Sequence, residues 1–189
     1  MTDRDRLLRL LAGRSVRRGD FTLASGVKSS YYLDARRTTT HAEGQWLAGR
    51  LVLGAIRGAG LGPDAVGGLT MGADPLAYAI AHASHGEGPA VHAFSVRKEP
   101  KGHGSGRVIE GCFASGDRVV VVEDVVTSGK SALRAARAVA GAGGTVLAVA
   151  ALVDREEGGA EAIRAAGYHL IPLFLAWEVL AAAELPPDP

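Results

Sequence analysis

Two acids and a small polar loop stand next to each other in VVVVEDVVTSGKS, residues 119–131. Glu123 and Asp124 follow four valines, and this apolar run predicts a strand that is buried on both faces. The loop after them precedes a predicted helix, whose free amide groups and positive dipole end attract anions. Its hydroxyl donors are Thr127, Ser128 and Ser131. The pattern predicts a cradle for a phosphate monoester beside two carboxylates.

The two acids place a constraint on the ligand. Carboxylates that faced the phosphate would repel it, so we expect them to meet hydroxyl groups or positive charge instead. A phosphorylated ribose supplies both a phosphate for the loop and vicinal hydroxyls for the acids. A solvated strand end is the alternative explanation for Glu123 and Asp124. A P-loop is a weaker alternative: Gly129, Lys130 and Ser131 match its end, but Asp124 stands where its first glycine belongs. Without a P-loop, Lys130 is expected to be a surface residue of the helix.

A basic, glycine-rich segment, RKEPKGHGSGRVIEG (residues 97–111), is the second candidate for chemistry. Glycines 102, 104 and 106 loosen the backbone, while Lys101 and His103 bring a charge and a titratable proton. Two of the four lysines, Lys98 and Lys101, lie here, and lysine suits phosphate oxygens. The segment is typical of a mobile lid, with a solvated hairpin tip as the alternative.

Apolar runs that alternate with helical patterns predict the elements that position these residues. We expect strands at 64–69, 90–96, 118–124, 145–154 and 168–175. One helix is expected to open at Thr40, which has capping-box spacing to Glu43, and others follow Met71, Ser128 and Glu156. The order predicts an α/β fold with a central, mainly parallel sheet flanked by helices on both faces. Ligands bind at the carboxyl ends of such strands, where Glu123 and Asp124 are expected.

Composition limits the class of protein. The chain has 189 residues, 47% of them apolar, which is enough for one sizeable core, so we expect a single domain over 1–189 with a disordered tail at 183–189. A net charge of +1 argues against a general nucleic-acid surface. Cys112 is the only cysteine and permits no internal disulfide. The charged, leucine-spaced start is neither a signal peptide nor a membrane span, so a cytoplasmic protein is expected.

Two further motifs are set aside. His82 and His85, in HASH, lack the third ligand that a zinc site requires. GAGLGP ends in Pro63 where a dinucleotide-binding fingerprint needs glycine, and it follows a predicted helix, not a strand.

The segment VVVVEDVVTSGKS resembles the phosphoribosyl pyrophosphate (PRPP) signature of the type I phosphoribosyltransferases. Three more stretches narrow the resemblance to the orotate phosphoribosyltransferase family, and with the signature they span residues 21–155. They are FTLASGVKSSYYLDARR (21–37), the glycine-rich segment 97–111, and ALVDREEGG (151–159). The resemblance implies a fold with a small hood from about residues 1–40, and transfer of ribose 5-phosphate from PRPP to orotate. It also implies Mg²⁺ held mainly through the substrate, and a homodimer that shares the catalytic loop across subunits.

The resemblance also implies a role for each matching residue. Lys101, His103 and Asp124 are the expected catalytic residues. Orotate is expected to meet Lys28, Tyr31, Tyr32, Thr127 and Arg155. The alternatives are a salt bridge at a helix start, within DREE, for Arg155 and a strand packed against the core for the two tyrosines. PRPP is expected to contact Lys28, Arg97, Lys98, Lys101, His103 and the run Glu123, Asp124, Val125, Val126, Thr127, Ser128, Gly129, Lys130 and Ser131.

The chain departs from the family pattern at one position. In GGLTMGADP (67–75), which resembles the pyrophosphate loop, Gly72 stands where some relatives carry lysine. Pyrophosphate binding would then depend on backbone amides, and on Lys28 and the lid for charge. Two alternative functions stay open from the residues: a phosphoribosyltransferase for another base, and a regulator that binds PRPP without catalysis.

Overall fold

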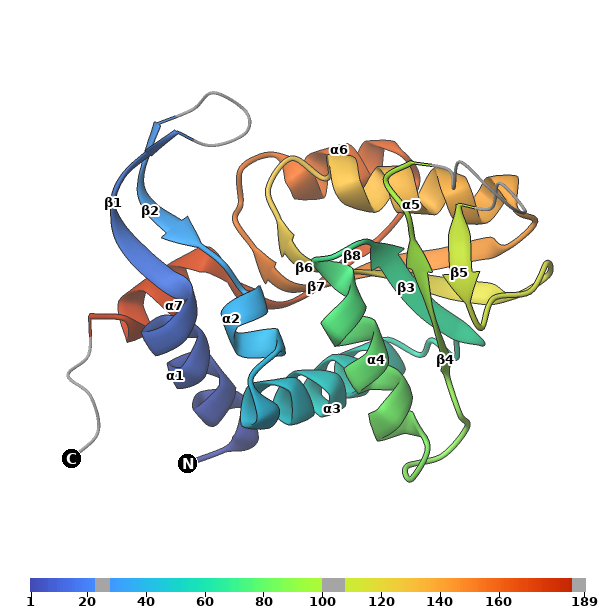
Figure 1. The fold of residues 1–189 in the computed structure, drawn as a ribbon, viewed down its shortest axis with the longest axis horizontal. Helices are drawn as coiled ribbons and strands as arrows, with labels where there is room; N and C mark the ends of the chain where they lie inside the picture. Colours follow the sequence, from blue (N-terminus) through green and yellow to red (C-terminus); the bar gives the residue numbers. More distant parts are fainter. Residues whose placement is uncertain (23–27, 100–107, 185–189) are drawn as a thin grey trace.

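The computed structural model describes residues 1–22, 28–99 and 108–184 (Figure 1). A six-stranded sheet forms its centre, with strand order β5-β4-β3-β6-β7-β8. Neighbouring strands are parallel except at the edge, where β5 runs antiparallel to β4. The bounds are β3 Ala65–Leu69, β4 His92–Val96, β5 Ile109–Gly111, β6 Arg118–Val126, β7 Thr145–Asp154 and β8 Leu170–Leu175. The predicted α/β class with a mainly parallel sheet is confirmed.

Helices cover both faces of this sheet. Helices α3 (Ala42–Gly58) and α4 (Ala73–Ser84) pack on one face, in a buried cluster that includes Val120 and Val122 of β6. Helices α5 (Lys130–Gly141) and α6 (Gly159–Ala165) cover the other face, in a cluster with Val119 and Val121. Figure 1 shows α5 and α6 on the opposite side of the sheet from α3. The alternation along β6 follows from the two-residue period of a strand.

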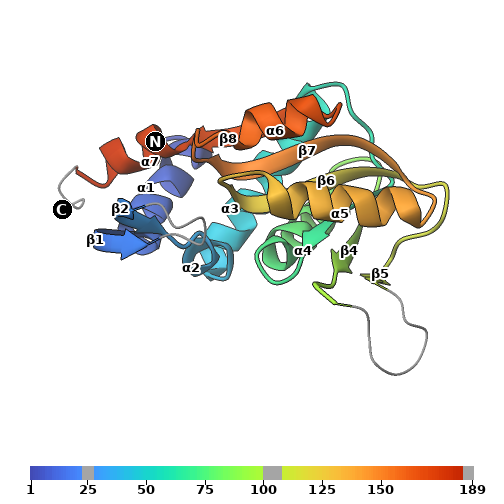
Figure 2. The same cartoon turned by 90° about the horizontal axis from the view of Figure 1, so that it is seen from above.

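The N-terminal part builds a separate small unit. After α1 (Asp3–Ser15), strands β1 (Val16–Thr22) and β2 (Lys28–Leu33) pair antiparallel in their own two-stranded sheet. This hairpin projects beside the main sheet, and a short helix, α2 (Arg36–Thr39), leads from it into α3 (Figures 1 and 2). Helix α1 also packs against the C-terminal helix α7 (Ala176–Ala182), and its Leu7 and Leu11 join the same core cluster as α3.

The helix start predicted at Thr40 is wrong. Helix α3 begins at Ala42, and its cap is His41, whose side chain accepts a hydrogen bond from the Gly44 N–H. The Thr40 hydroxyl instead donates to the Arg36 carbonyl at 2.6 Å, because it closes the short helix α2. Glu43 is an ion-pair partner of Arg6 and does not complete a capping box.

Strand ends also differ by small amounts from the prediction. β4 and β8 each begin two residues later than expected, at His92 and Leu170, while β6 extends two residues further, to Val126. The elements α1, β1 and β2 of the implied hood, together with β5, α2 and α7, had no individually predicted counterpart. Residues 185–189 of the expected disordered tail lie outside the described residues. Across the described ranges no helix has the length and apolar character needed to cross a membrane.

Candidate active site

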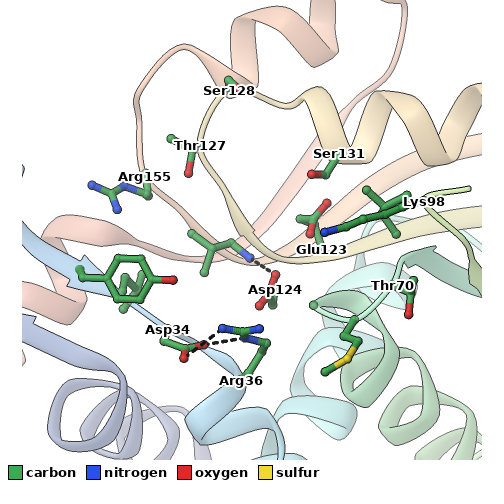
Figure 3. A pocket seen from close by; sticks show the side chains of 16 residues that line it. Asp34, Arg36, Thr70, Lys98, Glu123, Asp124, Thr127, Ser128, Ser131 and Arg155 are labelled. Carbon is green, nitrogen blue, oxygen red and sulfur yellow. Dashed lines mark hydrogen bonds and ion pairs between the residues drawn. The ribbon is translucent and has the colours of Figure 1, made fainter. Parts of the chain in front are cut away.

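A cleft of about 400 Å³ opens where β3 and β6 end (Figure 3). This is the edge at which parallel α/β sheets bind ligands, and the volume falls within the range of small-molecule sites. The cleft is lined by Tyr32, Leu33, Asp34, Arg36, Leu69, Thr70, Met71, Gly72, Lys98, Glu123, Asp124, Val125, Thr127, Ser128, Ser131 and Arg155. The structure thus brings the acids, the hydroxyl loop and Arg155 of the sequence prediction to one place.

The two acids enter the cleft from opposite faces of the sheet. Because β6 continues to Val126, Glu123 and Asp124 are successive residues of a strand, and their side chains alternate. Glu123 is 6% exposed, and its Oε2 atom is buried without a hydrogen-bond partner among the described residues. Burial, followed by the neighbouring Asp124, raises the pKa of Glu123 well above its ordinary value, and the nearby Lys98 opposes this. Oε2 of Glu123 is therefore a buried polar atom for which a ligand in the cleft can supply the partner.

Asp124 is held more firmly than Glu123. Burial raises the pKa of Asp124, while the hydrogen bond donated by the Val125 N–H and the charge of Arg36 oppose the shift. That bond joins Val125 N to Asp124 Oδ1 at 3.0 Å. The carboxylate lies directly against Gly72 at the start of α4: a Cβ atom there would come within 2.5 Å of Oδ1. Any side chain at position 72 would therefore collide with Asp124 as it is placed in this chain.

The predicted phosphate loop is the turn between β6 and α5. Gly129 has φ +73° at the helix N-cap, and a Cβ there would approach the Gly159 carbonyl oxygen to 3.0 Å, so both conformation and space favour glycine. The cleft-lining members of the loop are Val125, Thr127, Ser128 and Ser131. The free amides at the start of α5 and these hydroxyls form a surface suited to an anion.

Two predicted members of the PRPP set have other surroundings. Val126 is 1% exposed and belongs to the core cluster under α5; its carbonyl accepts from the Arg155 N–H at 2.9 Å. Lys130 is exposed and is not among the residues that line the cleft. The surface position of Lys130 matches the interpretation that a P-loop is absent.

Arg155 forms the opposite wall of the cleft. Its side chain is 4% exposed and is clamped by Glu157, with 2.7 Å from Nη2 to Oε1. The guanidinium also lies 4.4 Å from the centre of the Tyr31 ring, where a cation–π contact is favourable. Burial raises the pKa of Tyr31, and the charge of Arg155 opposes this. Tyr32, 38% exposed, lines the same cleft and packs its ring against Phe21.

The predicted basic residues separate into three groups. Lys98 lines the cleft beside Glu123 (Figure 3). Arg97 does not line it and lies 4.0 Å from Glu110, while Lys28 is exposed in a separate recess on the hairpin. Lys101 and His103 lie outside the described residues.

The sequence interpretation gave no role to several residues that the structure places in the cleft. Asp34 and Arg36 come from the LDARR end of the 21–37 stretch and form an ion pair with 2.8 Å from Nε to Oδ1. Thr70 donates to Asp74 at 2.5 Å in the loop after β3. The three charged residues of LDARR were the only signal available, because no local pattern predicts that Asp34 and Arg36 reach the cleft at the end of β6.

Comparison with known proteins agrees with this geometry. Residues 42–166 match the family model described as a phosphoribosyl transferase domain. The orotate phosphoribosyltransferase of Aquifex aeolicus is 47% identical over 183 residues, which cover 95% of this chain and 99% of that protein. The corresponding enzyme of Rhodopirellula baltica is 46% identical over 168 residues, with 87% of each chain covered.

A solved structure supports the same assignment. The orotate phosphoribosyltransferase of Mycobacterium tuberculosis, crystallised in complex with PRPP, superposes with a TM-score of 0.80 at 43% identity. The match covers 97% of this chain and all of that one (100%). The family model, the two relatives and this structure agree over most of the sequence. The chain therefore belongs to the orotate phosphoribosyltransferase family of the type I phosphoribosyltransferases.

Proposed function

We propose that this protein transfers ribose 5-phosphate from PRPP to orotate, giving orotidine 5′-monophosphate and pyrophosphate in the cytoplasmic de novo synthesis of UMP. The observation that carries the proposal is the buried Oε2 atom of Glu123, which has no hydrogen-bond partner among the described residues and lies in one cleft with an anion cradle. A ribose hydroxyl, which can donate or accept, supplies a partner for this atom, and the 5′-phosphate fills the cradle.

The cleft separates the parts of the substrate. Thr127, Ser128 and Ser131 line the end that receives the 5′-phosphate, with the amides of Gly129 and the first turn of α5. Glu123 and Asp124 orient the ribose hydroxyls. In the reaction the bond from C1′ to the pyrophosphate oxygen breaks, a bond from C1′ to a ring nitrogen of orotate forms, and that nitrogen loses its proton. Positive charge that develops on the ribose ring is stabilised by the two adjacent carboxyl groups.

Orotate is expected at Arg155. The Nε and Nη2 atoms of Arg155 both reach Oε1 of Glu157, and Nη2 also donates to Ser29 Oγ at 3.5 Å, so the guanidinium is fixed in the wall of the cleft. A planar guanidinium that is fixed in this way suits the carboxylate of a planar ligand. Tyr31 and Tyr32 supply aromatic surface next to it, and Thr127 adds a hydroxyl from the phosphate loop.

Magnesium is proposed as the cofactor, held mainly through oxygens of the substrate. Mg²⁺ keeps its waters and binds readily to phosphate oxygens, so it needs few protein ligands. When bound, Mg²⁺ neutralises charge on the leaving pyrophosphate.

The remaining predicted residues are assigned to the leaving group. Lys101 and His103 are proposed to close over pyrophosphate from the neighbouring subunit of a homodimer, which shares the loop between its active sites. Lys98 already lines the cleft, whereas Arg97 and Lys28 would have to approach the ligand from outside it. Closure of such a lid excludes water that would otherwise intercept the ribosyl group.

The direct test is an ultraviolet assay that follows orotate consumption with PRPP and Mg²⁺. Loss of orotate that depends on both additions is the expected result. PRPP binding without loss of orotate would indicate a regulatory protein that binds PRPP without catalysis. Consumption of a purine base in place of orotate would reassign the substrate.

A further inference from the structure

Arg36 lines the cleft, and the site predicted from the sequence gave it no role. The residues just before Arg36 are fixed in place. Leu33 and Ala35 are buried, and the Asp34 N–H donates to the Ser15 carbonyl at 2.9 Å. Asp34 is thereby fixed at the start of α2, with its carboxylate turned toward Arg36 (Figure 3). A long side chain that is anchored this way loses less freedom when it binds a ligand.

The Asp34 carboxylate takes up only one edge of the Arg36 guanidinium. Nε donates to Oδ1 at 2.8 Å and Nη2 donates to Oδ2 at 3.2 Å. A guanidinium has five N–H bonds, so three of them, two on Nη1 and one on Nη2, point beyond this pair. The side chain is 44% exposed and lines the cleft, which leaves this edge within reach of a ligand.

The position of Arg36 is next to the loop that resembles the pyrophosphate loop. Thr70, Met71 and Gly72 line the same cleft, and Gly72 packs directly against Asp124. Figure 3 shows the Arg36 guanidinium beside the Asp124 carboxylate. The guanidinium and the loop thus meet at one carboxylate, on the face of the sheet that α4 covers.

The other cations of the cleft are placed for different partners. Arg155 is buried under Glu157 and Tyr31 on the opposite wall. Lys98 lies at Glu123, on the other face of β6 (Figure 3). Lys28, the residue expected to compensate for Gly72, lines a separate recess. Among the residues described, Arg36 is the cation that the structure brings to the α4 side of the cleft.

We propose that Arg36, oriented by Asp34, binds the diphosphate group of the sugar substrate and supplies the positive charge that the loop lacks at Gly72. This inference rests on the proposed function, since it assumes a ribosyl diphosphate as the ligand. The planar fork of arginine can contact two phosphate oxygens at once.

The test compares ligands that differ only in the diphosphate. Affinities for PRPP, inorganic pyrophosphate and ribose 5-phosphate, each with Mg²⁺, are measured by calorimetry on the full chain. R36Q should weaken PRPP and pyrophosphate about 10- to 100-fold, the range for hydrogen bonds to charged groups. The same variant should leave ribose 5-phosphate within about twofold. R36K should retain part of the affinity, because it keeps the charge and loses the fork.

R37Q is the matched control. Arg37 is the next residue of α2, is exposed and does not line the cleft, so the same change of charge there should leave all three affinities unaltered. D34N keeps the Arg36 charge and removes its anchor, and it should weaken pyrophosphate binding less than R36Q does. Thermal unfolding of each variant identifies any loss of fold, in which case R36K and D34N decide the question.

Two results would overturn the assignment. If R36Q binds pyrophosphate as tightly as R37Q, Arg36 is not a ligand of the diphosphate. If R36Q weakens ribose 5-phosphate and PRPP by the same factor, it acts on the ribose through Asp124. Failure of the proposed function is separable: a wild-type protein that binds none of the three ligands, or binds PRPP without consuming orotate, removes that function whatever R36Q does.

Discussion

Replacing Gly72 by alanine should impair the site without weakening the fold. The new Cβ atom would lie 2.5 Å from Oδ1 of Asp124, and ordinary contact begins at 3.4 Å, so this oxygen must retreat by about 0.9 Å. The same oxygen accepts the hydrogen bond from the Val125 N–H. The carboxylate therefore cannot move away without losing this hydrogen bond and the orientation proposed for binding ribose.

The two effects of this substitution differ in size. Gly72 has helical angles, φ −59° and ψ −46°, so alanine fits the backbone and contributes about 0.4–1 kcal/mol to stability. The lost hydrogen bond costs about 0.5–1.5 kcal/mol, which leaves the free energy of unfolding within about 1 kcal/mol of wild type. A misplacement of about 1 Å in a reactive site can reduce turnover about 100-fold, equivalent to about 2.7 kcal/mol.

The assay measures kcat/KM with orotate, PRPP affinity and thermal unfolding for G72A. G54A is the control, because Gly54 lies in α3 and a Cβ atom added there would meet no atom within 4 Å, so this variant should gain stability and keep full activity. In a D124A background the clash is gone, so G72A should cause no further loss of PRPP affinity. Wild-type kcat/KM for G72A, or an equal loss of affinity with and without Asp124, would refute the reasoning.

Three further predictions concern the acids, the base site and the subunit arrangement. Because the pKa of Glu123 is raised in the folded chain, the folded state keeps a proton that the unfolded chain releases near pH 4.5, so stability falls as pH rises above that value. E123Q should therefore raise the Tm more at pH 8 than at pH 5 and weaken PRPP binding; a gain that is the same at both pH values contradicts the shift. R155Q should raise the KM for orotate at least about 10-fold, from the loss of a charge-assisted bond, and spare ribose 5-phosphate affinity; equal losses for both ligands would place Arg155 elsewhere. K101A and D124N should each be inactive, and mixing them should restore activity if the subunits share sites; mixed dimers without recovery would exclude the shared loop.

Local sequence patterns were sufficient to predict elements in which apolar residues dominate the segment. The strand predicted at 145–154 coincides with β7, Thr145–Asp154, because parallel strands buried on both faces are continuously apolar. The four valines before Glu123 located β6 for the same reason. The start of α5 followed from a small polar turn that only glycine completes at φ +73°.

Local patterns failed where a short element depends on its neighbours. The start of α3 was misplaced because Thr40 closes α2, a single turn that no periodicity reveals. The cleft residues Asp34 and Arg36 were missed for a related reason. Gly72 and Asp124, which line the same cleft, are distant from them in the sequence, so only the folded chain brings these residues together.

The amino-acid sequence by itself determined the α/β order, the pairing of two acids with a phosphate loop, and the family resemblance, since each of these is written in contiguous residues. Only the tertiary structure decided which charges reach the cleft. It brought Arg36 in and left Lys28 and Lys130 outside, and it placed the Asp124 carboxylate where a side chain at position 72 would stand. The physical reason is that a charge acts over a few ångströms of space, and packing, not chain order, sets those distances.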